Sequence, residues 1–214
     1  HADLVLINDP TNLDRFRQVN PNTHYQWHCY MPELHHPGPT EPDHRSEFAF
    51  VGTGFASRIA FLEQVDWSGV DATFAGHWQH LDDNSPLLPF LAHDLEECCD
   101  NRQTANLYRG TQLSANLYRK EAERPALSDG WAMGPREVEL AAIGTPFLRE
   151  ARPEGDDLLS FLPRFTDPNE FTDLMRWHLA RPELLASLGD RAREAVAPRT
   201  FANSAARMLR LLNL

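Results

Sequence analysis

Short apolar runs alternate with helix-like stretches along most of the chain, from residue 47 onward. Residues 48–51 form an apolar run that ends in a glycine turn at 52–54, and apolar positions recur at near-helical spacing over 57–65. This order predicts a strand, a turn and a helix. Alternation of strands with helices is typical of a parallel sheet covered by helices. We therefore predict an α/β fold with a parallel sheet flanked by helices.

The elements that follow keep the same alternation. Pro135 near the first turn and Gly144 at the end mark the helix that we expect over 134–144. The acidic run at 94–97 is interpreted as a solvated helix face or cap. The other expected elements are strands at 71–76, 112–117 and 146–148, a weaker apolar element at 87–92, a short helix at 104–108, and two or three amphipathic helices over 169–214.

The first forty residues form a separate unit in this interpretation. The apolar run at 2–8 predicts a buried strand, and a second apolar and aromatic run spans 25–30. The Pro-rich segment at 36–42 can neither continue a helix nor pair as a central strand. We place a boundary there, so that residues 1–40 make one unit with its linker and residues 46–214 make the other.

Composition narrows the class of protein. A chain of 214 residues with 42% hydrophobic residues suits one globular domain, or a domain with part of another. A net charge of −11 disfavours nucleic acid as a partner. No stretch approaches the roughly 18 to 20 continuous apolar residues of a membrane span. Cys29, Cys98 and Cys99 make no paired framework, which favours a reducing compartment, and we expect a cytoplasmic protein.

A first candidate for phosphate binding is the turn Gly52-Thr53-Gly54 before the helix that carries Arg58. In an open parallel sheet, ligands bind outside the carboxyl ends of the strands, where helix N-termini offer free N–H groups. Glycines let the backbone approach a diphosphate, and the guanidinium could clamp its oxygens in a bidentate way. The alternative is that the two glycines only make the turn.

A second candidate is the start of the later helix, where Arg136 and Glu139 share one face. The arginine could bind phosphate, and the carboxylate could accept two hydrogen bonds from vicinal ribose hydroxyls. The alternative is a capping carboxylate with a surface ion pair. Asn116 and Arg119 follow a predicted strand, so they could contact a bound sugar or phosphate, or be ordinary polar residues at a strand end.

Two other groups of residues give weaker signals. His77-Trp78 could stack on a base or sugar, although a packed aromatic at a loop entrance is favoured. Four histidines lie around the Pro-rich segment without a carboxylate or cysteine at ligand spacing, so we expect them to be exposed and expect no metal site. They are His28, His35, His36 and His44.

One segment resembles a known family. The run Arg136-Glu137-Val138-Glu139-Leu140-Ala141-Ala142-Ile143-Gly144 is similar to the R-x-x-E-x-x-A-x-G segment of group-1 glycosyltransferases, in particular their CgeB-like, spore-maturation branch. Residues 50–53 with Arg58, then 107–116, then 199–201 resemble further motifs of that family in the same order. The resemblance spans about 46–214 and implies the Rossmann-like, C-terminal half of a GT-B enzyme.

The resemblance implies that this half binds the nucleotide diphosphate of an activated sugar, of UDP, GDP or dTDP type, without metal. Glu139 would then hold the ribose, with Arg136, Arg58 and the turn at 52–54 near the diphosphate. The sugar would pass to an unidentified glycan, protein or small-molecule acceptor held by an N-terminal half, of which residues 1–40 resemble only the final strands.

The chain departs from the family pattern at one position. Retaining members often carry a glutamate eight residues before the ribose carboxylate, where this chain has Trp131. No residue is therefore assigned a catalytic role, and a catalytically inactive binding or scaffold domain is the alternative function. A doubly wound domain of another kind, flavodoxin-like or epimerase-like, is a third and weaker interpretation.

Overall fold

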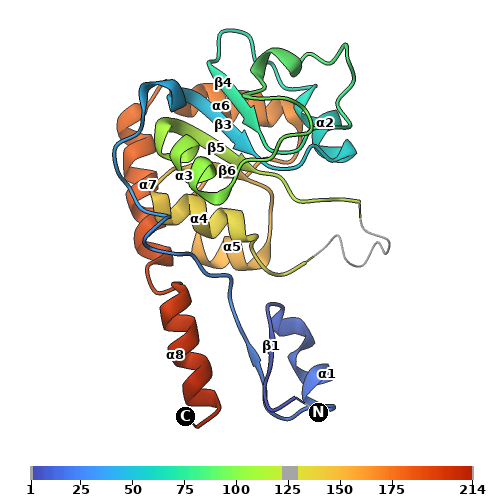
Figure 1. Cartoon of the computed structure of the whole chain (residues 1–214), viewed down its shortest axis with the longest axis vertical. Coiled ribbons are helices and arrows are strands. Elements are labelled where there is room, and N and C mark those ends of the chain that lie inside the picture. The colour runs from blue at the N-terminus through green and yellow to red at the C-terminus, as the bar shows by residue number, and fades with distance from the viewer. Residues whose placement is uncertain (1, 122–129, 214) are drawn as a thin grey trace.

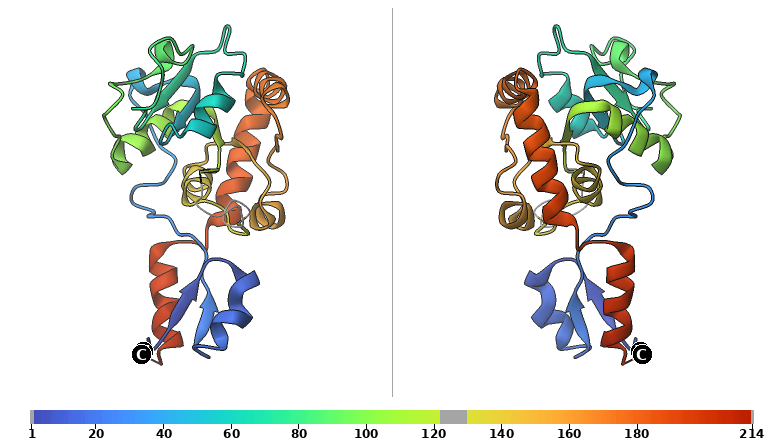
Figure 2. Two further views of the ribbon diagram at one scale, coloured as in Figure 1. Left: turned by 90° about the vertical axis from the view of Figure 1, so that its right-hand side faces the viewer. Right: turned by 90° about the vertical axis from the view of Figure 1, so that its left-hand side faces the viewer.

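The chain folds into two lobes in the computed structural model, which describes residues 2–121 and 130–213 (Figure 1). The large lobe is built on a four-stranded sheet. The small lobe lies at the other end of the molecule and combines both ends of the chain (Figure 2). The α/β class predicted from the sequence is confirmed.

All strands of the large sheet are parallel, in the order β4-β3-β5-β6. The chain leaves the central strand β3 for β4 on one side and later returns to β5 on the other side. The carboxyl ends of β3 and β5 therefore flank a topological switch point, where open α/β sheets bind ligands. The strands are β3 (Ser46–Val51), β4 (Ala72–Ala75), β5 (Thr111–Asn116) and β6 (Phe147–Arg149).

Helices cover both faces of this sheet. Phe48 and Phe74 pack with α2 and α6 on one face, where Phe171 of α6 is fully buried. Val51 packs with α3 and α4 on the other face, and α7 lies against α4. The helices of the large lobe are α2 (Ala56–Leu62), α3 (Asn101–Gly110), α4 (Pro135–Ile143), α5 (Pro153–Leu158), α6 (Pro168–Leu179) and α7 (Pro182–Val196).

Local signals placed α4 correctly and α3 only in part. Pro135 begins α4, and Gly144 ends it with a φ of 87°, a left-handed conformation that favours glycine. The short helix predicted at 104–108 is wrong in length, because Asp100 accepts a hydrogen bond from the N–H of Gln103 and starts α3 earlier. The acidic run at 94–97 is not helical, so its interpretation as a helix face is wrong.

The small lobe joins the first strands of the chain to its last helix. β1 (Val5–Ile7) and β2 (Thr23–Tyr25) pair in parallel, with α1 (Leu13–Arg17) between them in sequence. The strand predicted at 2–8 is present, but it is only half-buried, because its sheet has just two strands. Helix α8 (Phe201–Leu211) returns to this lobe (Figure 2). There Arg207 donates to the side-chain oxygen of Gln26 at 3.0 Å.

The segment between the lobes lies along α3 and α4. Arg109 donates to the carbonyl of Leu34 at 2.9 Å, and Thr40 donates to the carbonyl of Asn106 at 3.2 Å. The boundary predicted near residue 40 stays a prediction. Within the described ranges, no helix is long and apolar enough to cross a membrane. The other elements of the part that the structure describes are short 3₁₀ turns at Pro10–Asn12, Pro42–His44 and Leu88–Phe90.

Candidate functional site

A hollow of about 290 Å³ lies at the carboxyl ends of β3 and β5, at the switch point of the large sheet. It is bounded by the turn after β3, the segment after β5 and the first residues of α4. Its lining residues are Phe50, Val51, Gly52, Arg58, Asn116, Leu117, Tyr118, Arg119, Gly134, Pro135 and Arg136.

The structure brings five of the eight predicted binding residues into this hollow. They are Gly52, Arg58, Asn116, Arg119 and Arg136. The other three, which are Thr53, Gly54 and Glu139, do not line it. The two predicted phosphate turns thus meet at one rim, although they lie some eighty residues apart in the sequence.

The charge of the hollow is opposite to that of the whole chain. Three arginines line it, and none of its described lining residues is acidic, whereas the chain carries a net charge of −11. The N-terminus of α4 adds the partial positive charge of the helix dipole. The hollow is therefore suited to an anion rather than to a cation.

The guanidinium of Arg58 already donates hydrogen bonds to backbone carbonyls of the protein. Its Nε and Nη2 donate to the carbonyl of Leu117 at 3.0 and 2.6 Å, and its Nη1 donates to the carbonyl of Thr53 at 3.0 Å. The Nε and Nη2 groups of Arg58, which could have bound a diphosphate in a bidentate way, are thus occupied by the carbonyl of Leu117. Arg58 joins the turn after β3 to the end of β5, so it shapes the rim of the hollow.

Arg119 is differently placed, because its guanidinium stacks 4.5 Å from the ring centroid of Phe55 and makes no ion pair with a described residue. Asn116 is buried, and its Nδ2 has no hydrogen-bond partner among the described residues. An unpaired buried amide is costly unless a ligand or water satisfies it. These two side chains are available to a ligand.

Arg136 and Glu139 form the ion pair that the sequence offered as the alternative to a binding site. Arg136 Nη1 lies 2.7 Å from a carboxylate oxygen of Glu139, and its guanidinium lies over the ring of Tyr108. Burial raises the pKa of Glu139, and the nearby Arg136 opposes that rise. Since Arg136 lines the hollow, this pair places a carboxylate directly behind its rim.

Close packing explains two glycines of the turns. Gly76 has a φ of 105°, and a Cβ there would collide with the carbonyl of Gly52. A Cβ on Gly54 would lie 2.6 Å from Cε3 of Trp78, which is fully buried. Gly54 therefore makes a packed turn, and Trp78 is the packed aromatic that the sequence favoured over a stacking platform for a ligand.

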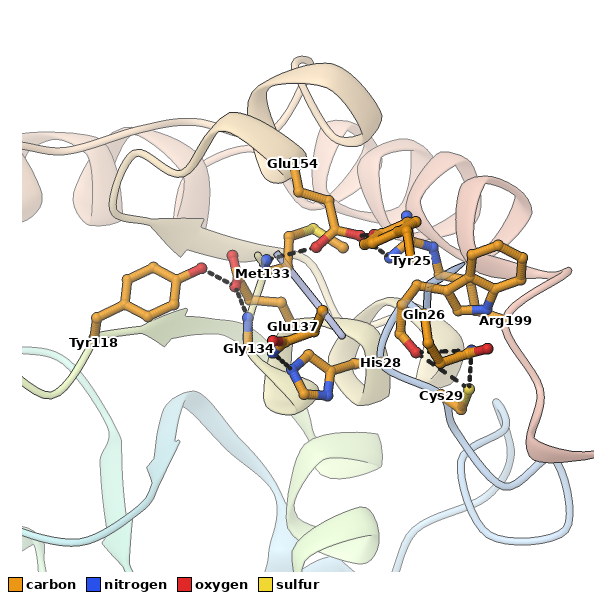
Figure 3. A network of polar contacts seen from close by, with 12 residues as sticks. Tyr25, Gln26, His28, Cys29, Tyr118, Met133, Gly134, Glu137, Glu154 and Arg199 are labelled. Carbon is orange, nitrogen blue, oxygen red and sulfur yellow. Dashed lines mark hydrogen bonds and ion pairs between the residues drawn. The ribbon is translucent and has the colours of Figure 1, made fainter. Parts of the chain in front are cut away.

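Sequence reasoning missed a buried acid behind the start of α4. Glu137 is fully buried, and it accepts hydrogen bonds from the N–H of Gly134 at 2.7 Å and from the hydroxyl of Tyr118 (Figure 3). Burial raises the pKa of Glu137 to about 7. Its place in the first helical turn is the only signal in the sequence, and that signal indicates a cap rather than a buried group.

Of the four histidines predicted to be exposed, His36 is exposed, whereas His28 and His44 are half-buried. His35 was expected to be exposed, but it is 6% exposed, and its Nδ1 accepts a hydrogen bond from the N–H of Met31 at 3.2 Å. Burial, aided by the charges of Arg136 and Arg109, lowers the pKa of His35 to about 4. It lies on the segment between the lobes and is a structural acceptor.

Comparison with known families agrees with this geometry. The profile of a family described as glycosyl transferase-like matches residues 58–213. The chain belongs to this family. The match covers most of the large lobe and continues through α8 into the small lobe. No curated protein sequence matches the chain.

Solved structures share the fold at low sequence identity. Sucrose-phosphate synthase from Thermosynechococcus elongatus has a TM-score of 0.68 at 16% identity, over 100% of this chain and 58% of that one. HepE from Anabaena, in complex with UDP and glucose, has a TM-score of 0.67 at 13% identity, over 98% of this chain and 63% of that one. The C-terminal domain of LpcC, a group 1 glycosyl transferase from Francisella tularensis, has a TM-score of 0.55 at 9% identity, over 79% of this chain and 97% of that one. The chain thus spans about three fifths of the first two proteins.

Proposed function

We propose that the chain supplies the nucleotide-sugar-binding half of a GT-B glycosyltransferase of the CgeB-like branch. In this proposal a sugar passes from a nucleotide-diphosphate donor to a glycan, protein or small-molecule acceptor that an N-terminal half holds. Family membership supports the class of reaction. The structural likeness to HepE, solved with UDP and glucose, supports the class of donor.

The observation that carries the proposal is the cationic hollow at the switch point of an acidic chain. Arg119, Arg136 and the N-terminus of α4 would neutralise the diphosphate as it leaves the sugar. Fixed positive groups aimed at a departing anion lower the barrier without a metal ion. Glu139, behind Arg136, would accept hydrogen bonds from the ribose hydroxyls.

Calorimetric titration with UDP, GDP and dTDP tests this proposal. We expect one of them to bind, and we expect Arg136→Ala and Arg119→Ala each to weaken that binding about tenfold, which is about 1.4 kcal/mol. Arg193→Ala is the matched control, because Arg193 lies on α7 and pairs only with the exposed Asp190 among the described residues. Equal loss in the control, or no binding of any of the three nucleotides, would contradict the proposal.

A catalytically inactive binding domain is the second candidate, and Trp131 favours it. Its ring packs edge-on against Tyr25 at 5.5 Å and places no carboxylate at that position. The two functions differ in turnover of a sugar nucleotide. Release of UDP from UDP-glucose by the protein with its acceptor half would exclude the inactive domain, whereas nucleotide binding without release would favour it.

A further inference from the structure

A buried carboxylate lies where the two lobes meet. The side chain of Glu154, on α5, is 3% exposed and accepts three hydrogen bonds from three separate segments (Figure 3). The hydroxyl of Tyr25 at the end of β2 donates at 2.5 Å, and Arg199 between α7 and α8 donates at 2.5 Å. The N–H of Met133, just before α4, donates at 2.7 Å.

The arrangement constrains all three segments together. A carboxylate removed from water is tolerated only when charges and donors replace its hydration. Tyr25 and Arg199 both donate to Oε1, so loss of either leaves that oxygen with one donor instead of two. Met133 donates to Oε2, and its loss leaves that oxygen with no donor among the described residues. The positions of Tyr25, Arg199 and Met133 are therefore set by one group, although they belong to the small lobe, to the junction of the lobes and to the large lobe.

The segment held in the large lobe leads directly to the hollow. The N–H of Glu154 donates to the carbonyl of Trp131 at 3.1 Å, while its carboxylate holds the N–H of Met133. The next residue, Gly134, lines the hollow and is the N-cap residue of α4. Trp131 also packs its ring against Tyr25. The small lobe thus contacts the segment that positions the helix N-terminus.

We propose that Glu154 is a positioning residue for the donor site, and that Tyr25 couples the N-terminus of α4 to the position of the small lobe. A shift of the small lobe moves the tyrosine, releases one donor from the carboxylate and loosens residues 131–134. The anion-binding end of α4 is then less ordered. This inference rests on the proposed function, because it gives that donor site its dependence on the small lobe.

Tyr25→Phe tests the coupling, because it removes the hydroxyl and keeps the ring beside Trp131. Tyr30→Phe is the matched control, since its hydroxyl lies at the same junction but donates at 3.5 Å to the carbonyl of Ala197. We expect hydrogen exchange at Met133 and Gly134 to be about fivefold faster in Tyr25→Phe. We expect the affinity for whichever of UDP, GDP and dTDP binds to be about threefold weaker. Both values stay within about twofold of the wild type in the control.

Glu154→Gln is the stronger variant, with a larger expected change in both measurements. Equal exchange at Met133 and Gly134 in Tyr25→Phe and Tyr30→Phe would overturn the coupling. A lower melting temperature with unchanged nucleotide affinity would overturn the positioning role and leave Glu154 a structural residue. If the wild-type chain binds none of UDP, GDP and dTDP, the proposed function fails, and the exchange rates alone then decide the coupling.

Discussion

Replacing Glu137 with glutamine should stabilise the protein at alkaline pH. The carboxyl group is fully buried, and burial raises its pKa to about 7 in the folded chain against 4.5 in the unfolded chain. The folded chain thus keeps a proton that the unfolded chain releases, so this group lowers stability as pH rises from 4.5 to 7. The free energy of unfolding falls by 1.36 kcal/mol for each unit between the two pKa values, which amounts to about 3 kcal/mol above pH 7.

Glutamine is uncharged and nearly the same size, and its carbonyl can still accept from the N–H of Gly134. Urea unfolding at pH 5 and pH 8 gives the free energy of unfolding for both proteins. We expect the advantage of Glu137→Gln to grow by about 2 to 3 kcal/mol between these two pH values.

Glu194→Gln is the control, since Glu194 is exposed on α7. It should leave the pH dependence of unfolding unchanged. The reasoning is refuted if Glu137→Gln shows the same pH dependence as the wild type, because the buried group then titrates as it does in water.

Two further substitutions test the packing and the charge of other groups. Gly76→Ala should lower the free energy of unfolding by more than about 2 kcal/mol, because the new Cβ meets the carbonyl of Gly52 and the residue has a positive φ. Gly69→Ala is the control, since Gly69 has a φ of 72° but lies in open space, and it should lower the free energy of unfolding by only about 1 kcal/mol. Thermal melts measure both variants. His35→Gln should reduce the acid sensitivity of unfolding. The pKa of His35 is lowered to about 4, so its contribution to stability is lost as pH falls from 6.5 to 4, and equal unfolding curves at pH 4.5 would contradict this.

The sequence predicted those parts of the fold that depend on local signals. Pro135 and Gly144 set the ends of α4 by their backbone preferences, and the apolar runs placed the strands of the large sheet. Helix α5 was not predicted, because a helix of six residues is too short to show a helical period of apolar positions. The packing of α8 beside the first strands was not predicted either, since a local sequence pattern carries no information on a contact between residues 26 and 207.

The candidate site was predictable in its composition but not in its contacts. Spacing placed Arg136 and Glu139 on one helix face, yet it could not tell a ligand-binding pair from the ion pair that they form. Glu137 and Glu154 follow prolines at the starts of helices, where carboxylates usually cap in water. Their burial depends on Tyr118 and Tyr25, which come from distant parts of the chain.

The central claim is that the hollow between β3, β5 and α4 binds a nucleotide diphosphate. Amide chemical shifts recorded during titration with UDP, GDP and dTDP test it most directly. For the nucleotide that binds, we predict the largest shifts at Gly52, at Gly134 and at the side-chain amide of Asn116. Shifts that gather away from these residues, or no shifts with any of the three nucleotides, would contradict the account.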